Sequence, residues 1–138
     1  MLLSPRKLLL AVPIALLPLV GCGEDEPLTM SDKRFVCRAT IATVMGRSIH
    51  SVEEFEFQGD IISVQYTRSS DDTLWQYACK IEKDRVIWAN IENGTIGRWR
   101  DSGDDERLSF RTTESKIKIL QTFVDGSTTY EEFYRSSN

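Results

Sequence analysis

The sequence has few of the residues on which most metal and catalytic sites depend. It contains three cysteines and one histidine, His50, in 138 residues. Zinc sites usually draw four ligands from cysteine and histidine, and neither a spaced zinc motif nor a phosphate-binding glycine loop is present. We therefore expect no metal ion and no cofactor.

Arrangements typical of catalysis are also missing. Ser48 and His50 lie close together in the sequence, but no nucleophile elbow or activated-thiol context surrounds them. The acidic clusters at 71–72 and 104–106 lack the ligand spacing of a calcium-binding EF-hand loop. The sequence therefore predicts a protein that is not an enzyme.

Long hydrophobic runs are absent as well. The apolar stretch at residues 8–20 is shorter than the ~20 residues that a transmembrane helix needs, and Pro13 and Pro18 interrupt it. Arg6 and Lys7 precede this stretch, and a small residue follows it, which is the pattern of a secretory signal peptide. We expect residues 1–21 to be a signal peptide that is cleaved.

The apolar stretch runs into Leu19-Val20-Gly21-Cys22. These four residues resemble the lipobox of bacterial lipoproteins. The resemblance implies that the Cys22 thiol accepts a diacylglycerol and that cleavage occurs just before it. The alternative is an ordinary signal peptide with a chance cysteine. Because two or three acyl chains hold a soluble domain firmly at a membrane, residues 22–30 are expected to be a lipidated cysteine and a polar tether.

The residue after Cys22 and the overall charge bear on location and partners. Gly23 stands where an aspartate would resemble the inner-membrane retention signal, so the resemblance implies an outer-membrane anchor facing the periplasm in a diderm host. In other hosts it implies the outer face of the cytoplasmic membrane. Loss of residues 1–21 removes Arg6 and Lys7 and no acidic residue, so the formal net charge changes from −4 to −6. Such an acidic domain is a poor partner for nucleic acid, and we expect none.

Cys37 and Cys79 remain if Cys22 is lipidated. An even pair of cysteines in a small exported domain is typical of a disulfide. Two free buried thiols or a metal pair are the alternatives, and a single histidine makes the metal pair unfavourable. We therefore predict a Cys37–Cys79 disulfide.

Hydrophobic spacing predicts one helix at residues 31–46, followed by strands. Ser31 or Thr29 suits the helix N-cap and Gly46 its end, and Cys37 falls on the apolar face. After His50 the period changes to two, and Cys79 falls on the inward face of a strand. For the strand at 86–91 the pattern does not decide which residues point inward, because residues on both of its faces are apolar. Turn signals separate these strands at 58–60, 82–85 and 125–126.

Together these patterns predict an α+β fold for a single globular periplasmic domain at residues 31–138. One N-terminal helix would pack on an antiparallel β-meander of about six strands. The disulfide would join the helix to a strand, in agreement with both periodicities.

The segment "GRWRD" at 97–101 is the candidate binding loop. Arg98, Trp99 and Arg100 have the composition of binding hot spots, which are rich in tryptophan and arginine. The alternative is structural: Trp99 would close one end of the core, and the arginines would pair with nearby aspartates. The domain resembles uncharacterised small envelope lipoproteins that have a cysteine-bearing helix and a similar loop, and this resemblance implies no function.

Lipoprotein lysozyme inhibitors share the general design of a small tethered domain. Their inhibitory loop resembles Ser-Gly-x-x-Tyr, whereas here Ser102-Gly103-Asp104-Asp105 is followed by Glu106. We expect a membrane-anchored, non-catalytic binding or accessory protein of the cell envelope, with an envelope protein as its possible partner. The alternatives are a structural or assembly accessory without a specific ligand, and an inhibitor, immunity or exclusion-type lipoprotein.

Overall fold

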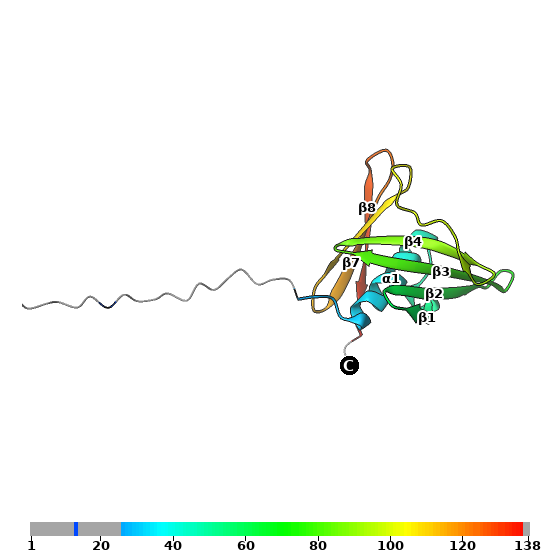
Figure 1. The fold of residues 1–138 in the computed structure, drawn as a ribbon, viewed down its shortest axis with the longest axis horizontal. Coiled ribbons are helices and arrows are strands. Elements are labelled where there is room, and N and C mark those ends of the chain that lie inside the picture. The colour runs from blue at the N-terminus through cyan, green and yellow to red at the C-terminus, as the bar shows by residue number, and fades with distance from the viewer. Residues whose placement is uncertain (1–12, 14–25, 137–138) are drawn as a thin grey trace, which may run out of the picture.

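The computed structural model describes Pro13 and residues 26–136 (Figure 1). Most of the expected signal peptide and Cys22 therefore lie outside the described residues. The described chain forms one α-helix, α1 (Met30–Met45), a short 3₁₀-helix, η1 (Ile49–Ser51), and eight strands: β1 (Glu53–Gln58), β2 (Ile61–Arg68), β3 (Thr73–Glu82), β4 (Arg85–Glu92), β5 (Thr95–Ile96), β6 (Arg107–Thr112), β7 (Lys116–Thr122) and β8 (Thr128–Tyr134).

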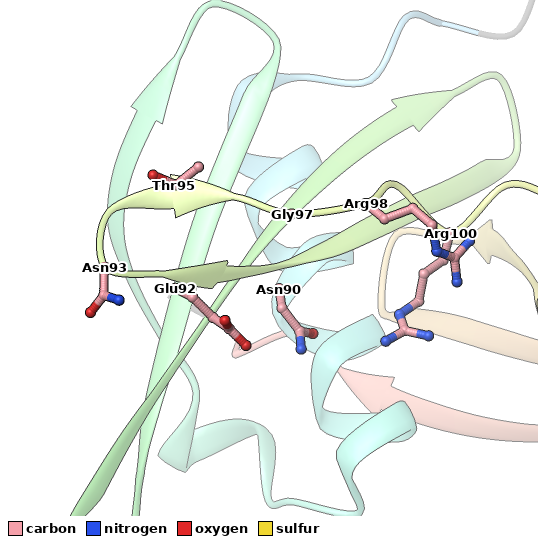
Figure 2. Close-up of a pocket in the computed structure, with 7 residues that line it drawn as sticks. All are labelled: Asn90, Glu92, Asn93, Thr95, Gly97, Arg98 and Arg100. Atoms are coloured by element: carbon pink, nitrogen blue, oxygen red, sulfur yellow. The ribbon is translucent and has the colours of Figure 1, made fainter.

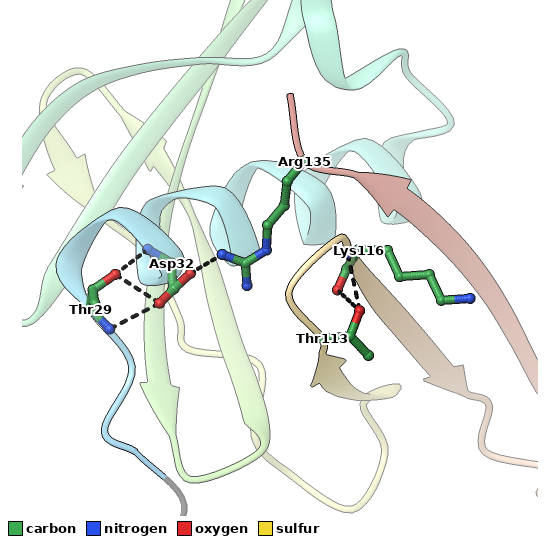
Figure 3. A network of polar contacts seen from close by, with 5 residues as sticks. All are labelled: Thr29, Asp32, Thr113, Lys116 and Arg135. Atoms are coloured by element: carbon green, nitrogen blue, oxygen red, sulfur yellow. Dashed lines mark hydrogen bonds and ion pairs between the residues drawn. The ribbon is translucent and has the colours of Figure 1, made fainter. Parts of the chain in front are cut away.

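Helix α1 begins at a complete capping box. The Thr29 hydroxyl accepts a hydrogen bond from the Asp32 backbone N–H at 3.1 Å, and the Asp32 carboxylate accepts one from the Thr29 N–H at 3.2 Å. The same carboxylate pairs with Arg135, which follows the last strand (Figure 3). The cap therefore satisfies the first turn of the helix and also ties the helix to the C-terminal end of the described chain.

The strands form one antiparallel sheet in the order β1-β2-β3-β4-β6-β7-β8, and β5 pairs with β4 beside this path. Strand β4 shares only two register pairs with β6, Arg85–Ser109 and Val86–Leu108. Because the sheet is so narrow at this β4–β6 seam, its two parts can turn sharply relative to each other. Figure 1 shows β7 and β8 crossing steeply relative to β2, β3 and β4.

Helix α1 lies within the curl of the sheet and contacts strands of both parts, including β2, β3 and β7. Its middle is buried on more than one side, as the burial of Val36 and Thr40 beside Cys37 and Ile41 shows. We call the face of the sheet toward α1 the concave face and the opposite face the convex face.

The predicted fold class is wrong. The described part of the chain is mostly β, with eight antiparallel strands curled as a half-barrel around one α-helix, and not a six-strand meander packed on a helix. Two physical causes explain the difference. Strand β5 has only two residues and lies in a glycine-rich stretch without a period, and the curl arises at the β4–β6 seam, which is a long-range pairing.

The predicted Cys37–Cys79 disulfide is confirmed. It joins α1 to β3, with the two Cα atoms 5.9 Å apart. Both cysteines are fully buried in the core between the helix and the concave face. Thr29 and not Ser31 is the N-cap, and Gly46 ends the helix in the left-handed conformation with φ of 63°.

Candidate functional site

The loop that carries the candidate residues runs along the edge of β4. The Gly97 N–H donates to the Asn90 carbonyl at 2.8 Å, and the Arg100 N–H donates to the Trp88 carbonyl at 2.9 Å. The segment 97–100 thus occupies the place beside β4 that a longer β5 would take. Two backbone hydrogen bonds hold its register, so its side chains have defined directions.

Trp99 lies on the convex face of the sheet. The Lys80 Nζ atom lies 4.0 Å from the centroid of the Trp99 ring, a cation–π contact. Lys80 follows Cys79 on β3 and therefore points to the side opposite the disulfide. Trp99 does not belong to the core cluster, so the alternative in which it closes one end of the core does not describe its position.

Arg98 is neutralised by an aspartate, as the structural alternative anticipated. Its guanidinium donates two hydrogen bonds to the Asp105 carboxylate, at 2.7 and 2.9 Å. Asp105 also accepts hydrogen bonds from the backbone N–H and the hydroxyl of Ser102. The hydrogen bonds from Arg98 are the main cause of the lowered pKa of Asp105. This pair therefore fixes the loop between the segment 97–100 and β6.

Arg100 differs from Arg98, because none of the described carboxylates forms an ion pair with it. Its guanidinium carbon lies 4.4 Å from the centroid of the Trp88 ring. Its Nε atom is buried and has no hydrogen-bond partner among the described residues. Asp104, Asp105 and Glu106 line a small hollow together with Arg100 and Trp88, but none of them reaches ion-pair distance.

A row of buried aromatic rings lies next to Arg100 on the concave face. Tyr66 and Tyr77 stack with their centroids 6.0 Å apart, and the Tyr77 ring meets Trp88 edge-on at 5.8 Å. The Arg47 guanidinium lies over the Tyr66 ring at 4.9 Å. Two arginines therefore cover the two ends of one aromatic row.

The two tyrosine hydroxyls lie 3.4 Å apart beneath this cover. Burial raises the pKa of Tyr77, and the hydrogen bond and the nearby charge of Tyr66 act in the same direction. Arg47 and Arg100 oppose this rise, since a positive charge favours the phenolate. Tyr77 stays a neutral hydrogen-bonding group at physiological pH.

A pocket of about 440 Å³ opens beside the segment 97–100 (Figure 2). Figure 2 shows Arg98 and Arg100 at one end, Glu92 and Asn93 toward the other, and Asn90 between them. The Asn90 Oδ1 atom is buried and has no partner among the described residues. The pocket is thus lined by an arginine and an asparagine that each keep one buried polar atom without a hydrogen-bond partner among the described residues.

The other residues considered from the sequence have structural roles. The Ser48 hydroxyl accepts a hydrogen bond from the His50 backbone N–H at the start of η1. Asp71 pairs with Arg68 in the turn between β2 and β3. Within residues 26–136 and Pro13, no group of three or more His, Cys, Asp or Glu side chains is placed to hold a metal ion.

Cys22, the predicted lipidation site, lies outside the described residues. None of the described helices is long and apolar enough to cross a membrane. Comparison of the chain with protein-family models, curated proteins and solved structures finds no match.

Two residues of the site, Arg47 and Asn90, were not expected from the sequence. Arg47 follows Gly46, where the helix ends, and could only have been read as a solvated residue. Asn90 interrupts an otherwise apolar strand, which is a signal that the sequence does contain. A polar residue between Ala89 and Ile91 indicates a position that faces a polar site.

Proposed function

We propose that the chain is a membrane-anchored bacterial lipoprotein that acts as a non-catalytic binding protein of the cell envelope. Its ligand or partner places an acidic group in the pocket beside Arg100. Cys22 carries the lipid, and the domain faces the periplasm from the outer membrane in a diderm host.

The lipobox-like residues 19–22 and the signal-peptide pattern before them support the anchor. The disulfide between Cys37 and Cys79 supports export, since such bonds persist mainly in oxidising compartments. The acidic tether after Cys22 supports a domain that stands away from an anionic membrane surface.

The environment of Arg100 carries the proposal of binding. Arg100 is half-buried and forms no ion pair with a described carboxylate, so its guanidinium is available to form charge-assisted hydrogen bonds with an acidic group from outside. The Trp88 ring beneath it holds the guanidinium plane in place before a ligand arrives. Arg98 adds less to recognition, because Asp105 already occupies its donors.

The anchor is tested by labelling growing cells with a radioactive fatty acid. We expect the wild-type protein to be labelled, and Cys22→Ala to lose the label and to stay unprocessed or soluble. Ser31→Ala, at an exposed position that leaves Cys22 and the disulfide intact, serves as the control and should keep the label. Labelling of Cys22→Ala at the wild-type level would contradict the lipoprotein assignment.

The pocket is tested by crosslinking in the intact envelope, followed by mass spectrometry. We expect a stoichiometric partner whose recovery falls about tenfold in Arg100→Gln, since a charge-assisted hydrogen bond is removed. Arg111→Gln removes the same charge from an exposed position on β6 and should leave recovery unchanged. Full recovery with a folded Arg100→Gln protein would refute the pocket, and the lack of any partner would favour a structural accessory.

A further inference from the structure

Strand β8 is one end of the sheet, and β7 is its only neighbour among the strands that the structure describes. The β7–β8 register runs without a shift from Lys116–Tyr134 to Thr122–Thr128. All of β8 is exposed except Phe133, which packs against the core. The other side of the strand is therefore a regular, solvent-exposed edge (Figure 1).

The hydrogen bonds at both ends of this pairing show which backbone groups are free. Arg135 N–H donates to Ser115 at 2.9 Å, and Phe123 N–H donates to Ser127 at 2.8 Å. In an antiparallel pair, the N–H and C=O groups of successive residues point alternately toward the neighbouring strand and away from it. In β8 the backbone groups of the odd-numbered residues point toward β7. The N–H and C=O groups that point away from the sheet belong to Thr128, Tyr130, Glu132 and Tyr134.

The opposite end of the sheet is built differently. Strand β1 carries an irregularity between Glu54 and Glu56, and bulges and charges are devices that protect an edge from pairing. Strand β8 has no bulge, proline or lysine, and its charges are limited to Glu131 and Glu132. Its outward-facing Tyr130 and Tyr134 are 61% and 72% exposed. Such an edge is suited to strand addition.

A second copy of the same strand is the less favoured occupant. In an antiparallel pair of two β8 strands centred on Glu131, that glutamate lies opposite itself. Centring one residue further places Glu132 opposite itself. Like charges directly opposite each other destabilise a strand pair. The register with the greatest overlap, centred on Glu131, and one of the two next longest are therefore disfavoured. The other, centred on Tyr130, places each glutamate opposite a threonine.

The surroundings of Glu131 indicate the chemistry of the partner. A groove of about 480 Å³ runs between β8 and the helices and is lined by Phe35, Ile49, Phe133 and Glu131, among others. Glu131 forms no ion pair with any described residue, whereas Glu132 pairs with Lys116 at 3.2 Å. Arg38, Arg47 and His50 also line the groove. The Arg38 guanidinium donates to the Val52 and Ile49 carbonyls, and the Arg47 guanidinium lies over the Tyr66 ring.

We propose that the free edge of β8 binds an extended strand of a partner protein that carries a basic side chain opposite Glu131. Backbone hydrogen bonds to the four free residues supply affinity. Apolar side chains on the inner face of the added strand enter the groove beside Phe133. This surface shares no lining residue with the pocket beside Arg100, so it goes beyond the proposed function.

Two synthetic eight-residue peptides test this proposal on the full-length protein in detergent. Both alternate threonine and valine, and a central residue is lysine in one and glutamate in the other. We expect the lysine peptide to bind about two- to tenfold more tightly, because it replaces a like charge by an opposite one. Binding should slow hydrogen exchange at the amides of Tyr130 and Glu132.

Two variants provide the controls. Glu131→Lys should reverse the preference between the peptides, without removing any backbone donor. Tyr130→Pro removes an edge donor that makes no bond to β7 and should weaken both peptides about fivefold. Equal binding of both peptides to the wild type, or protection that falls on β1, would overturn the proposal. A dimer detected by sedimentation and dissociated by the lysine peptide would also overturn it, because a second copy of the chain would then occupy the β8 edge.

Discussion

The part of the domain from α1 to β4 and the hairpin part from β6 to β8 are built on opposite principles. In the first, β3 pairs along most of its length with both neighbours, and the disulfide joins it to the helix. In the second, the last strand has a single neighbour and is almost wholly exposed. The two parts share the narrow β4–β6 seam and the contacts of α1 with β7.

We infer that the first part contributes most of the stability of the domain, whereas the second part leaves backbone groups available to a partner. The disulfide-linked part forms a rigid base for the aromatic row under Arg47 and Arg100. The hairpin part leaves backbone groups unpaired at its edge, which adds little stability and leaves them free for a partner. The four predictions that follow break or sharpen this contrast, and they are ordered by expected effect.

Removal of the disulfide should have the largest effect. The double variant Cys37→Ala with Cys79→Ala should lose about 4 kcal/mol of unfolding free energy, as the chain-entropy model gives for a loop of 42 residues. Denaturant unfolding of the two proteins measures the loss. A midpoint equal to that of the wild type would show that the disulfide does not distinguish the two parts.

A cavity at the seam should come next. Leu108 is 1% exposed and lies opposite Val86 across the seam, so Leu108→Ala should cost about 2–4 kcal/mol. Hydrogen exchange should accelerate more in β6–β8 than in β2–β3. Leu74→Ala, at a position that is 52% exposed, should change stability by less than about 0.5 kcal/mol. Equal acceleration of hydrogen exchange in β6–β8 and in β2–β3 would contradict the division of the sheet into two parts at the β4–β6 seam.

The helix cap that joins the two parts should give a smaller, pH-dependent effect. Burial works to raise the pKa of Asp32, but hydrogen bonds from Thr29 and Arg135 outweigh it and leave the pKa below 3.8. The ionised carboxylate therefore stabilises the fold above that value, and this stability is lost as the pH falls through the folded pKa. Asp32→Asn should cost about 0.5–2 kcal/mol at pH 7.

Thermal unfolding at several pH values tests the cap. The difference between wild type and Asp32→Asn should shrink steadily below pH 3.8. A difference that stays constant down to the most acidic conditions would exclude a role for the carboxylate charge.

The outer face of the hairpin should contribute least. Glu132 pairs with Lys116 at 3.2 Å, and both side chains are about one third exposed. Glu132→Gln should therefore change stability by less than about 0.5 kcal/mol. A loss above 1 kcal/mol would mean that the hairpin surface is needed for folding and is not spare surface for binding.

Local signals allowed the helix, several strand ends and the disulfide to be predicted, although the predicted fold class was wrong. Gly46, the Asp125-Gly126 turn and the alternation around Cys79 mark element ends and faces through short-range chemistry. Strand β4 was ambiguous because it is buried on both faces: Ile87 is 3% exposed and Trp88 7%. Alternation disappears in such a strand. The curl depends on the β4–β6 seam, which no local pattern encodes.

The site was predictable only in part, for a related reason. The composition of residues 97–101 identified the loop, because binding hot spots are enriched in tryptophan and arginine. The directions of the loop side chains depend on the backbone register of the loop against β4. This register places Trp99 and Arg100 on opposite faces of the sheet. Arg47 comes from the end of the helix, more than fifty residues away in the sequence.

The contrast between the two parts is tested most directly by residue-resolved hydrogen exchange of the oxidised full-length protein. We predict the slowest exchange in the centre of β3, at Ala78 and its neighbours. Along β8 we predict an alternation, in which Glu131 and Phe133 are protected while Tyr130 and Glu132 exchange almost as fast as unfolded chain. Uniform protection along β8 would contradict the free edge and, with it, the distinction between a stabilised base and an available hairpin.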